Sequence, residues 1–138
     1  MDGTDDLPRD DRNVRIDVRG KRDLTYSQWH RKTLSSKAYV TDVDFLEYRF
    51  EAGNLVLKGI FETKEWHVTQ PKYIENNPNF KAVKALSVIS GLPFYCVWYH
   101  TDENMQIDKF KVWEVSKEEK SSAKIFTPMG MKKFLEGL

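Results

Sequence analysis

The segment over residues 41–65, TDVDFLEYRFEAGNLVLKGIFETKE, restricts the possible fold more than any other part of this chain. Two runs rich in β-branched and aromatic residues flank a short stretch in which Gly53 and Asn54 tolerate a positive φ angle. Strands joined by such a short turn pair antiparallel. The segment therefore predicts a β-hairpin, with strands over 38–49 and 55–68.

More helices and strands are expected after the hairpin. NFKAVKALSVIS carries apolar residues along one stripe, as an amphipathic helix does, with Asn77 and Pro78 at its start and Gly91 at its end. LPFYCVWYH is a continuous apolar run, typical of a buried central strand. IDKFKVWEVS predicts another strand, KEEKSSAK a loop, and Thr127 with Pro128 the start of a last short helix.

A helix is also expected before the hairpin, over residues 26–34, with Thr25 as its cap. Residues 1–24 form an N-terminal segment that is expected to be flexible or a short edge strand. Residues 25–138 are expected to form a single domain. The order is helix, strand, strand, helix, strand, strand, helix, with room for one more strand before the second helix. This order predicts a mixed α/β fold.

Composition narrows the class of protein. Hydrophobic residues make up 40% of the chain, enough for a core, and the formal net charge is only +1. That charge argues against strong non-specific attraction to nucleic acid or an anionic membrane. The single cysteine, Cys96, excludes an internal disulfide and is expected to be a buried thiol. With no signal-peptide pattern and no apolar run of membrane-spanning length, we expect a soluble, cytoplasmic protein without a membrane partner.

Charged residues recur inside the predicted hairpin at positions that share a face. Because side chains alternate along a strand, Asp42 and Asp44 are expected on one side of the first strand, and Glu62 and Lys64 on one side of the second. Pairing of the strands would bring these groups together at the end away from the turn. Clustered acids repel, and Mg²⁺ or Mn²⁺, which prefer carboxylate oxygens, would remove the repulsion.

An Asp on one strand followed by Glu-x-Lys on the next resembles the PD-(D/E)XK nuclease superfamily. The matching residues are Asp44, Glu62 and Lys64, and the similarity covers about residues 25–115. It implies a restriction-endonuclease-like core of helix, three strands, helix and strand around a mixed sheet. An acidic residue on the first helix often completes the site in this superfamily, whereas Gln28 and His30 stand at the corresponding positions here.

The resemblance implies a metal-dependent DNA endonuclease that hydrolyses phosphodiester bonds with a metal-activated water. Asp44 and Glu62 would bind the metal together with the backbone carbonyl of Thr63, and Lys64 would position or deprotonate the water. Asp42 is either a further ligand or a hydrogen-bonding residue at the strand entrance. Duplex or branched DNA is the expected partner, and a homodimer is expected by analogy. The residues expected to contact nucleic acid are Gln28, His30, Arg31, Lys32 and Lys72.

Two other interpretations stay open. The domain could keep the nuclease fold and act as a non-catalytic module for nucleic-acid binding or complex assembly, since Gln28 and His30 replace the acidic residue of the first helix. Alternatively, the acids and Lys64 form an ordinary cross-strand ion pair on a solvated face. Trp66 and Trp98 are expected in the core or in an interface, with base stacking as the alternative.

Overall fold

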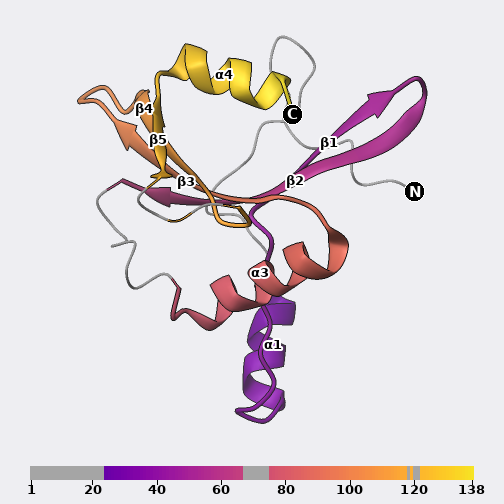
Figure 1. Cartoon of the computed structure of the whole chain (residues 1–138). Coiled ribbons are helices and arrows are strands. Elements are labelled where there is room, and N and C mark those ends of the chain that lie inside the picture. The colour runs from indigo at the N-terminus through magenta and orange to yellow at the C-terminus, as the bar shows by residue number, and fades with distance from the viewer. Residues whose placement is uncertain (1–23, 67–74, 118, 120–121) are drawn as a thin grey trace, which may run out of the picture. The chain divides into compact units, whose positions relative to one another are not determined.

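The computed structural model describes residues 24–66, 75–117, 119 and 122–138 (Figure 1). The chain divides into two compact units, Met1–Tyr39 and Val40–Leu138, and each is described by itself. Lys72 and residues 1–23 lie outside the described residues, so the boundary expected after residue 24 stays a prediction. No helix in the described ranges is long and apolar enough to cross a membrane.

The described part of the first unit holds helix α1, Thr25–Thr33. Leu24 takes the N-cap position and Thr25 is the first helical residue, one position from its predicted role as the cap. The hydroxyl of Ser27 donates to the Leu24 carbonyl at 3.0 Å. The last turn carries three basic residues, which suits the negative end of the helix dipole.

The second unit is built on a five-stranded sheet in the order β1-β2-β3-β4-β5. The β2–β3 pair is parallel and the other three pairs are antiparallel, which confirms the predicted α/β class with a mixed sheet. Helix α3 makes the parallel pair possible, because it lies in the crossover between β2 and β3. The elements are β1 (Phe45–Glu51), β2 (Asn54–Glu65), α3 (Pro78–Ser90), β3 (Phe94–Thr101), β4 (Ile107–Glu114), β5 (Lys124–Phe126) and α4 (Pro128–Glu136).

Two details of the predicted elements are wrong. The first strand begins at Phe45 and not at residue 38, so Asp42 and Asp44 precede the strand. The reason is local, because the Asp44 carboxylate accepts the Thr63 N–H, which a backbone carbonyl would accept if the ladder continued. Lys124 belongs to the edge strand β5 and not to a loop, and three residues carry too little pattern to reveal a strand.

The turn of the hairpin is confirmed, but the two residues with a positive φ angle lie one position earlier than the expected Gly53 and Asn54. Ala52 and Gly53 take positive φ angles of 51° and 82°, the signature of a two-residue type I′ turn. Gly53 adopts this conformation without steric cost. Ala52 does not, because its Cβ approaches the following carbonyl.

Each face of the sheet carries its own hydrophobic cluster, with α3 on one side and α4 on the other (Figure 1). β3 has buried side chains on both faces, as its continuous apolar sequence predicts. Cys96 is a free thiol with no exposed surface, as expected. The α3 face holds Ile60, Phe80, Val83, Phe94, Cys96, Trp98, Trp113 and Val115, and the α4 face holds Phe61, Tyr95, Val97, Val112 and Met131.

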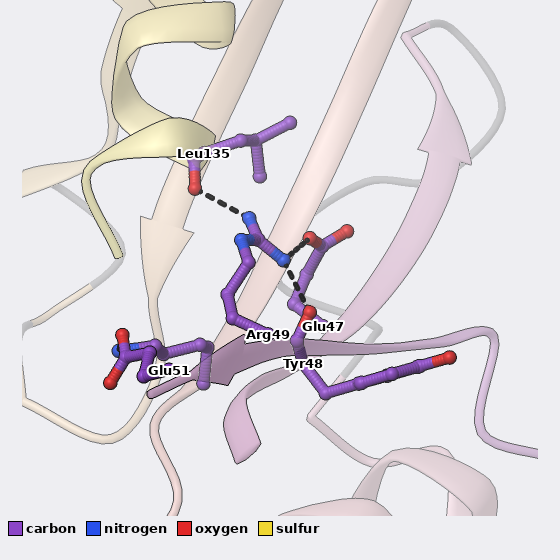
Figure 2. A network of polar contacts seen from close by, with 6 residues as sticks. Glu47, Tyr48, Arg49, Glu51 and Leu135 are labelled. Carbon is purple, nitrogen blue, oxygen red and sulfur yellow. Dashed lines mark hydrogen bonds and ion pairs between the residues drawn. The ribbon is translucent and has the colours of Figure 1, made fainter. Parts of the chain in front are cut away.

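Arg49 connects the hairpin to the last turn of α4 (Figure 2). One guanidinium nitrogen donates to the Leu135 carbonyl at 2.7 Å, and another donates to Glu47 Oε1 at 2.9 Å and to the Tyr48 carbonyl at 2.8 Å. The cation thus meets the negative end of the α4 dipole. This contact fixes the orientation of β1, and through it of β2, relative to α4.

Candidate active site

Asp44 and Glu62 lie opposite each other at the end of the hairpin away from its turn. The register pairs Phe45 with Phe61, so the next position outward brings the two acids together. Asp44 Oδ2 accepts a hydrogen bond from the Thr63 backbone N–H at 3.0 Å, and the Thr63 hydroxyl lies 3.5 Å from the same oxygen. These contacts hold the exposed Asp44 carboxylate beside the second strand.

The negative charge of the Glu62 carboxyl group is only partly balanced by the groups around it. Burial raises its pKa from the ordinary 4.5 to about 7, and the negative charge of Asp44 adds to this rise. The backbone amide of Asp44 and the ammonium of Lys64 act in the opposite direction. Glu62 Oε1 is buried and makes no hydrogen bond, an arrangement that costs free energy unless a proton or a cation is bound there.

Lys64 shares its face of the sheet with Glu62, as the alternation predicts. Glu62 pairs with Cys96 of β3, and Lys64 pairs with Trp98. Cys96 and Trp98 both belong to the cluster under α3. The carboxyl and the ammonium therefore follow one another along the α3 face of β2, and Lys64 is half-buried.

Within the described part of the second unit, Asp42 does not join this pair in a larger acidic group. Asp42 is exposed, precedes β1 by three residues, and accepts a hydrogen bond from the Thr41 hydroxyl at its backbone carbonyl. It therefore does not share a strand face with Asp44. The α1 residues belong to the other unit, and their contact with nucleic acid stays a prediction, as does that of Lys72, which lies outside the described residues. The α1 residues concerned are Gln28, His30, Arg31 and Lys32.

Sequence reasoning missed two lysines on the same face. The β3–β4 register pairs Trp98 with Lys111 and His100 with Lys109. Lys109 Nζ lies 5.0 Å from the centroid of the Trp66 ring, and Lys111 Nζ lies 5.9 Å from that of Trp98. The alternation of IDKFKVW already places both lysines on one face, but only the pairing of the strands shows that this is the face of Glu62.

The carboxylate pair fits a hard divalent cation. Mg²⁺ is often bound by one or two carboxylates and keeps several waters, and Asp44 with Glu62 provides such a pair. The buried, unpartnered Oε1 of Glu62 is a ready acceptor for it. Within the described ranges, no three His, Cys, Asp or Glu side chains gather into a larger metal-binding group.

Comparison with known proteins identifies no relative: no family model matches the chain, and neither a curated protein nor a solved structure matches it. What the fold and the site define is a mixed-sheet α/β domain that holds an Asp–Glu pair beside a lysine. The functional conclusion depends on that geometry.

Proposed function

We propose that this chain is a metal-dependent DNA endonuclease with a restriction-endonuclease-like core. The observation that carries the proposal is the position of Glu62. It lies opposite Asp44, is raised in pKa by burial and by that acid, and shares a strand face with Lys64. Perturbed acids beside a lysine are typical of catalytic sites, whereas a solvated cross-strand ion pair would leave no carboxylate oxygen buried and unpartnered.

The element order supports the core. α1, the β1–β2 hairpin, α3 and β3 follow each other along the chain in the order of the superfamily pattern, apart from its third strand. The acids lie where the hairpin strands end, next to the parallel strand β3. The pattern has a third strand before the second helix, and no such strand is found among the described residues that precede α3.

Each residue has a distinct role in the proposed reaction. Mg²⁺ or Mn²⁺, held by Asp44 and Glu62 with the Thr63 carbonyl as a further donor, would polarise the phosphodiester and lower the pKa of a bound water. The Thr63 N–H fixes the Asp44 carboxylate. Lys64 places a compact positive charge two residues beyond Glu62, where it orients the attacking water and stabilises the charge that develops on the phosphate.

Cleavage assays test the proposal directly. Plasmid and branched DNA are incubated with the protein in Mg²⁺ or EDTA, beside Lys64→Ala and Glu62→Gln. We expect Mg²⁺-dependent cutting that both variants lose by at least ~100-fold, the scale of acid–base and electrostatic contributions. Lys124→Ala, an exposed lysine of β5, is the matched control and should cut like the wild type. No cutting of any substrate, or equal cutting by Lys64→Ala, would refute the catalytic proposal.

A non-catalytic nucleic-acid-binding or assembly module is the second candidate. The observation that favours it is the size of the acidic group, because among the described residues only two acids meet. Calorimetric titration with Mn²⁺ separates the two candidates. Binding that disappears in Asp44→Asn and in Glu62→Gln supports the enzyme, and a wild-type protein that binds DNA but no Mn²⁺ supports the module.

A further inference from the structure

The sheet face that carries Glu62 changes character along its strands. Near the start of β3 it is apolar and covered by α3. Further along, the strand registers and the ring contacts bring basic and aromatic side chains of three neighbouring strands into two rows. We call these the lysine–tryptophan rows. The first row is Lys64, Trp98 and Lys111, and the second is Trp66, His100 and Lys109.

The lysines of β4 are held by tryptophan rings. Lys109 Nζ lies 5.0 Å from the Trp66 centroid, and Lys111 Nζ lies 6.0 Å from Trp66 and 5.9 Å from Trp98. Cation–π contacts at this range are attractive. They restrict long side chains whose ordering otherwise costs free energy on binding. Both ammonium groups are therefore partly ordered before any ligand arrives.

The rows carry an excess of positive charge. None of the ion pairs between described residues includes Lys64, Lys109 or Lys111. Asp108, the acid nearest in sequence, lies 2.7 Å from Nδ1 of His100. That hydrogen bond lowers the pKa of Asp108, so the acid stays charged beside the histidine.

The spacing of the lysines suits a strand of phosphates. Lys109 and Lys111 are two residues apart on one strand, about 7 Å. Lys64 and Lys111 are separated by two strand spacings, about 9.5 Å. Trp98 is only 3% exposed and its Nε1 has no hydrogen-bond partner, so the rows also include a donor without an acceptor. With a net charge of +1 for the whole chain, attraction of DNA would have to come from such a local group.

We propose that Lys64, Lys109 and Lys111 bind the phosphate groups of the DNA strand that lies in the candidate active site, and that Trp66 and Trp98 position the two lysines of β4. The inference rests on the proposed function and extends it, because it names the surface that guides the substrate. Glu62 lies two residues before Lys64 on β2 and on the same face, so a DNA strand that follows the rows passes directly to the carboxylate pair.

Salt-dependent binding tests the inference. Fluorescence anisotropy of a labelled duplex is measured in EDTA, so that no cutting occurs, between 50 and 200 mM salt. The test variant is Lys109→Ala/Lys111→Ala. The matched control is Lys124→Ala/Lys132→Ala, which removes the same charge from exposed positions of β5 and α4.

Loss of two phosphate contacts lowers the log–log salt slope by about 2, because each contact contributes roughly 0.9. We expect that change, with an affinity ~10- to 100-fold weaker at 50 mM salt, for the test variant but not for the control. Trp66→Ala keeps all the lysines and should weaken binding about 3-fold or more, whereas Trp66→Phe should retain most of it. Circular dichroism checks that each variant is folded.

The outcomes separate this inference from the proposed function. Equal affinities and slopes for the two double variants, or no binding of DNA by the wild type, would overturn the inference. A protein that cuts DNA through Lys64 in Mg²⁺ but binds it independently of Lys109 and Lys111 would keep the proposed function alone. A protein that binds through the rows and cuts nothing would keep the inference alone.

Discussion

Replacing Glu62 with Gln removes a carboxyl that folding places beside Asp44. Folding raises the pKa of this carboxyl from 4.5 to about 7, through burial first and the charge of Asp44 second. Between these pH values the native state binds more protons than the unfolded state, so the wild-type free energy of unfolding falls as the pH rises. The stabilising contribution is complete below about pH 4.5 and lost above about pH 7. Gln keeps the shape of the side chain but does not titrate, so the free energy of unfolding of the Gln variant should not show this fall.

The size of the stability difference follows from the pKa shift of Glu62. One pKa unit corresponds to about 1.36 kcal/mol, so a rise from 4.5 to about 7 sets an upper limit of about 3 kcal/mol. Glu62 is only half-buried, and solvent screening reduces this limit. We therefore expect Glu62→Gln to be more stable than the wild type by about 1 to 2 kcal/mol at pH 8, and nearly equal to it at pH 5.

Urea denaturation in EDTA at the two pH values measures the difference. Glu103→Gln is the control, because Glu103 is an exposed acid in the turn between β3 and β4, and its substitution should shift stability at neither pH. A Glu62→Gln variant that is less stable than the wild type at pH 8, or that differs by the same amount at both pH values, would refute the reasoning.

Three further predictions follow from contacts of the same unit. Mg²⁺ at 100 times its dissociation constant should raise the wild-type free energy of unfolding by about 2.7 kcal/mol, and Asp44→Asn should lose this gain in the same urea titration. Arg49→Met should lower stability by about 1 to 3 kcal/mol because it leaves the α4 carbonyl of Leu135 without its charged donor. Lys117→Met, which removes the exposed Lys117 from its 3.8 Å pair with Glu114, should cost less than about 0.5 kcal/mol. Ala52→Gly should stabilise the turn by about 0.5 to 1 kcal/mol because φ is positive there, and a less stable variant in thermal unfolding would contradict this.

Most of the fold could be predicted because its signals are local. Asn77 accepts the Asn79 N–H at the start of α3, Thr127 accepts the Gly130 N–H at the start of α4, and Gly91 ends α3 in the left-handed conformation. The strands β3 and β4 follow from their apolar and alternating sequences. Start positions that depend on one side chain could not be predicted. β1 begins at Phe45 because the Asp44 carboxylate replaces a backbone acceptor, and propensity alone does not reveal such a replacement.

The candidate site also contains residues that could be predicted from the sequence and residues that could not. Asp44, Glu62 and Lys64 could be proposed because strand side chains alternate between faces. Their exact register could not, because the β1–β2 pairing shifts by one residue between Glu47 and Tyr48, and without this shift the turn would place Asp44 opposite Phe61. Lys109 and Lys111 could not, since their relation to Glu62 depends on the β2–β3 and β3–β4 registers, and these join segments far apart in the sequence. Long-range strand pairing leaves little trace in a single sequence.

The position of Cys96 has a practical consequence. It is fully buried, it pairs with Glu62 across the parallel β2–β3 register, and burial raises the pKa of its thiol to about 12. Thiols are alkylated as thiolates, so the native protein should resist labelling until the packing of α3 over Cys96 opens. The chain therefore contains its own chemical probe of local opening at the site. The rate of alkylation, measured with and without Mg²⁺ or DNA, would report how strongly each ligand suppresses this local opening. The measurement needs no engineered substitution.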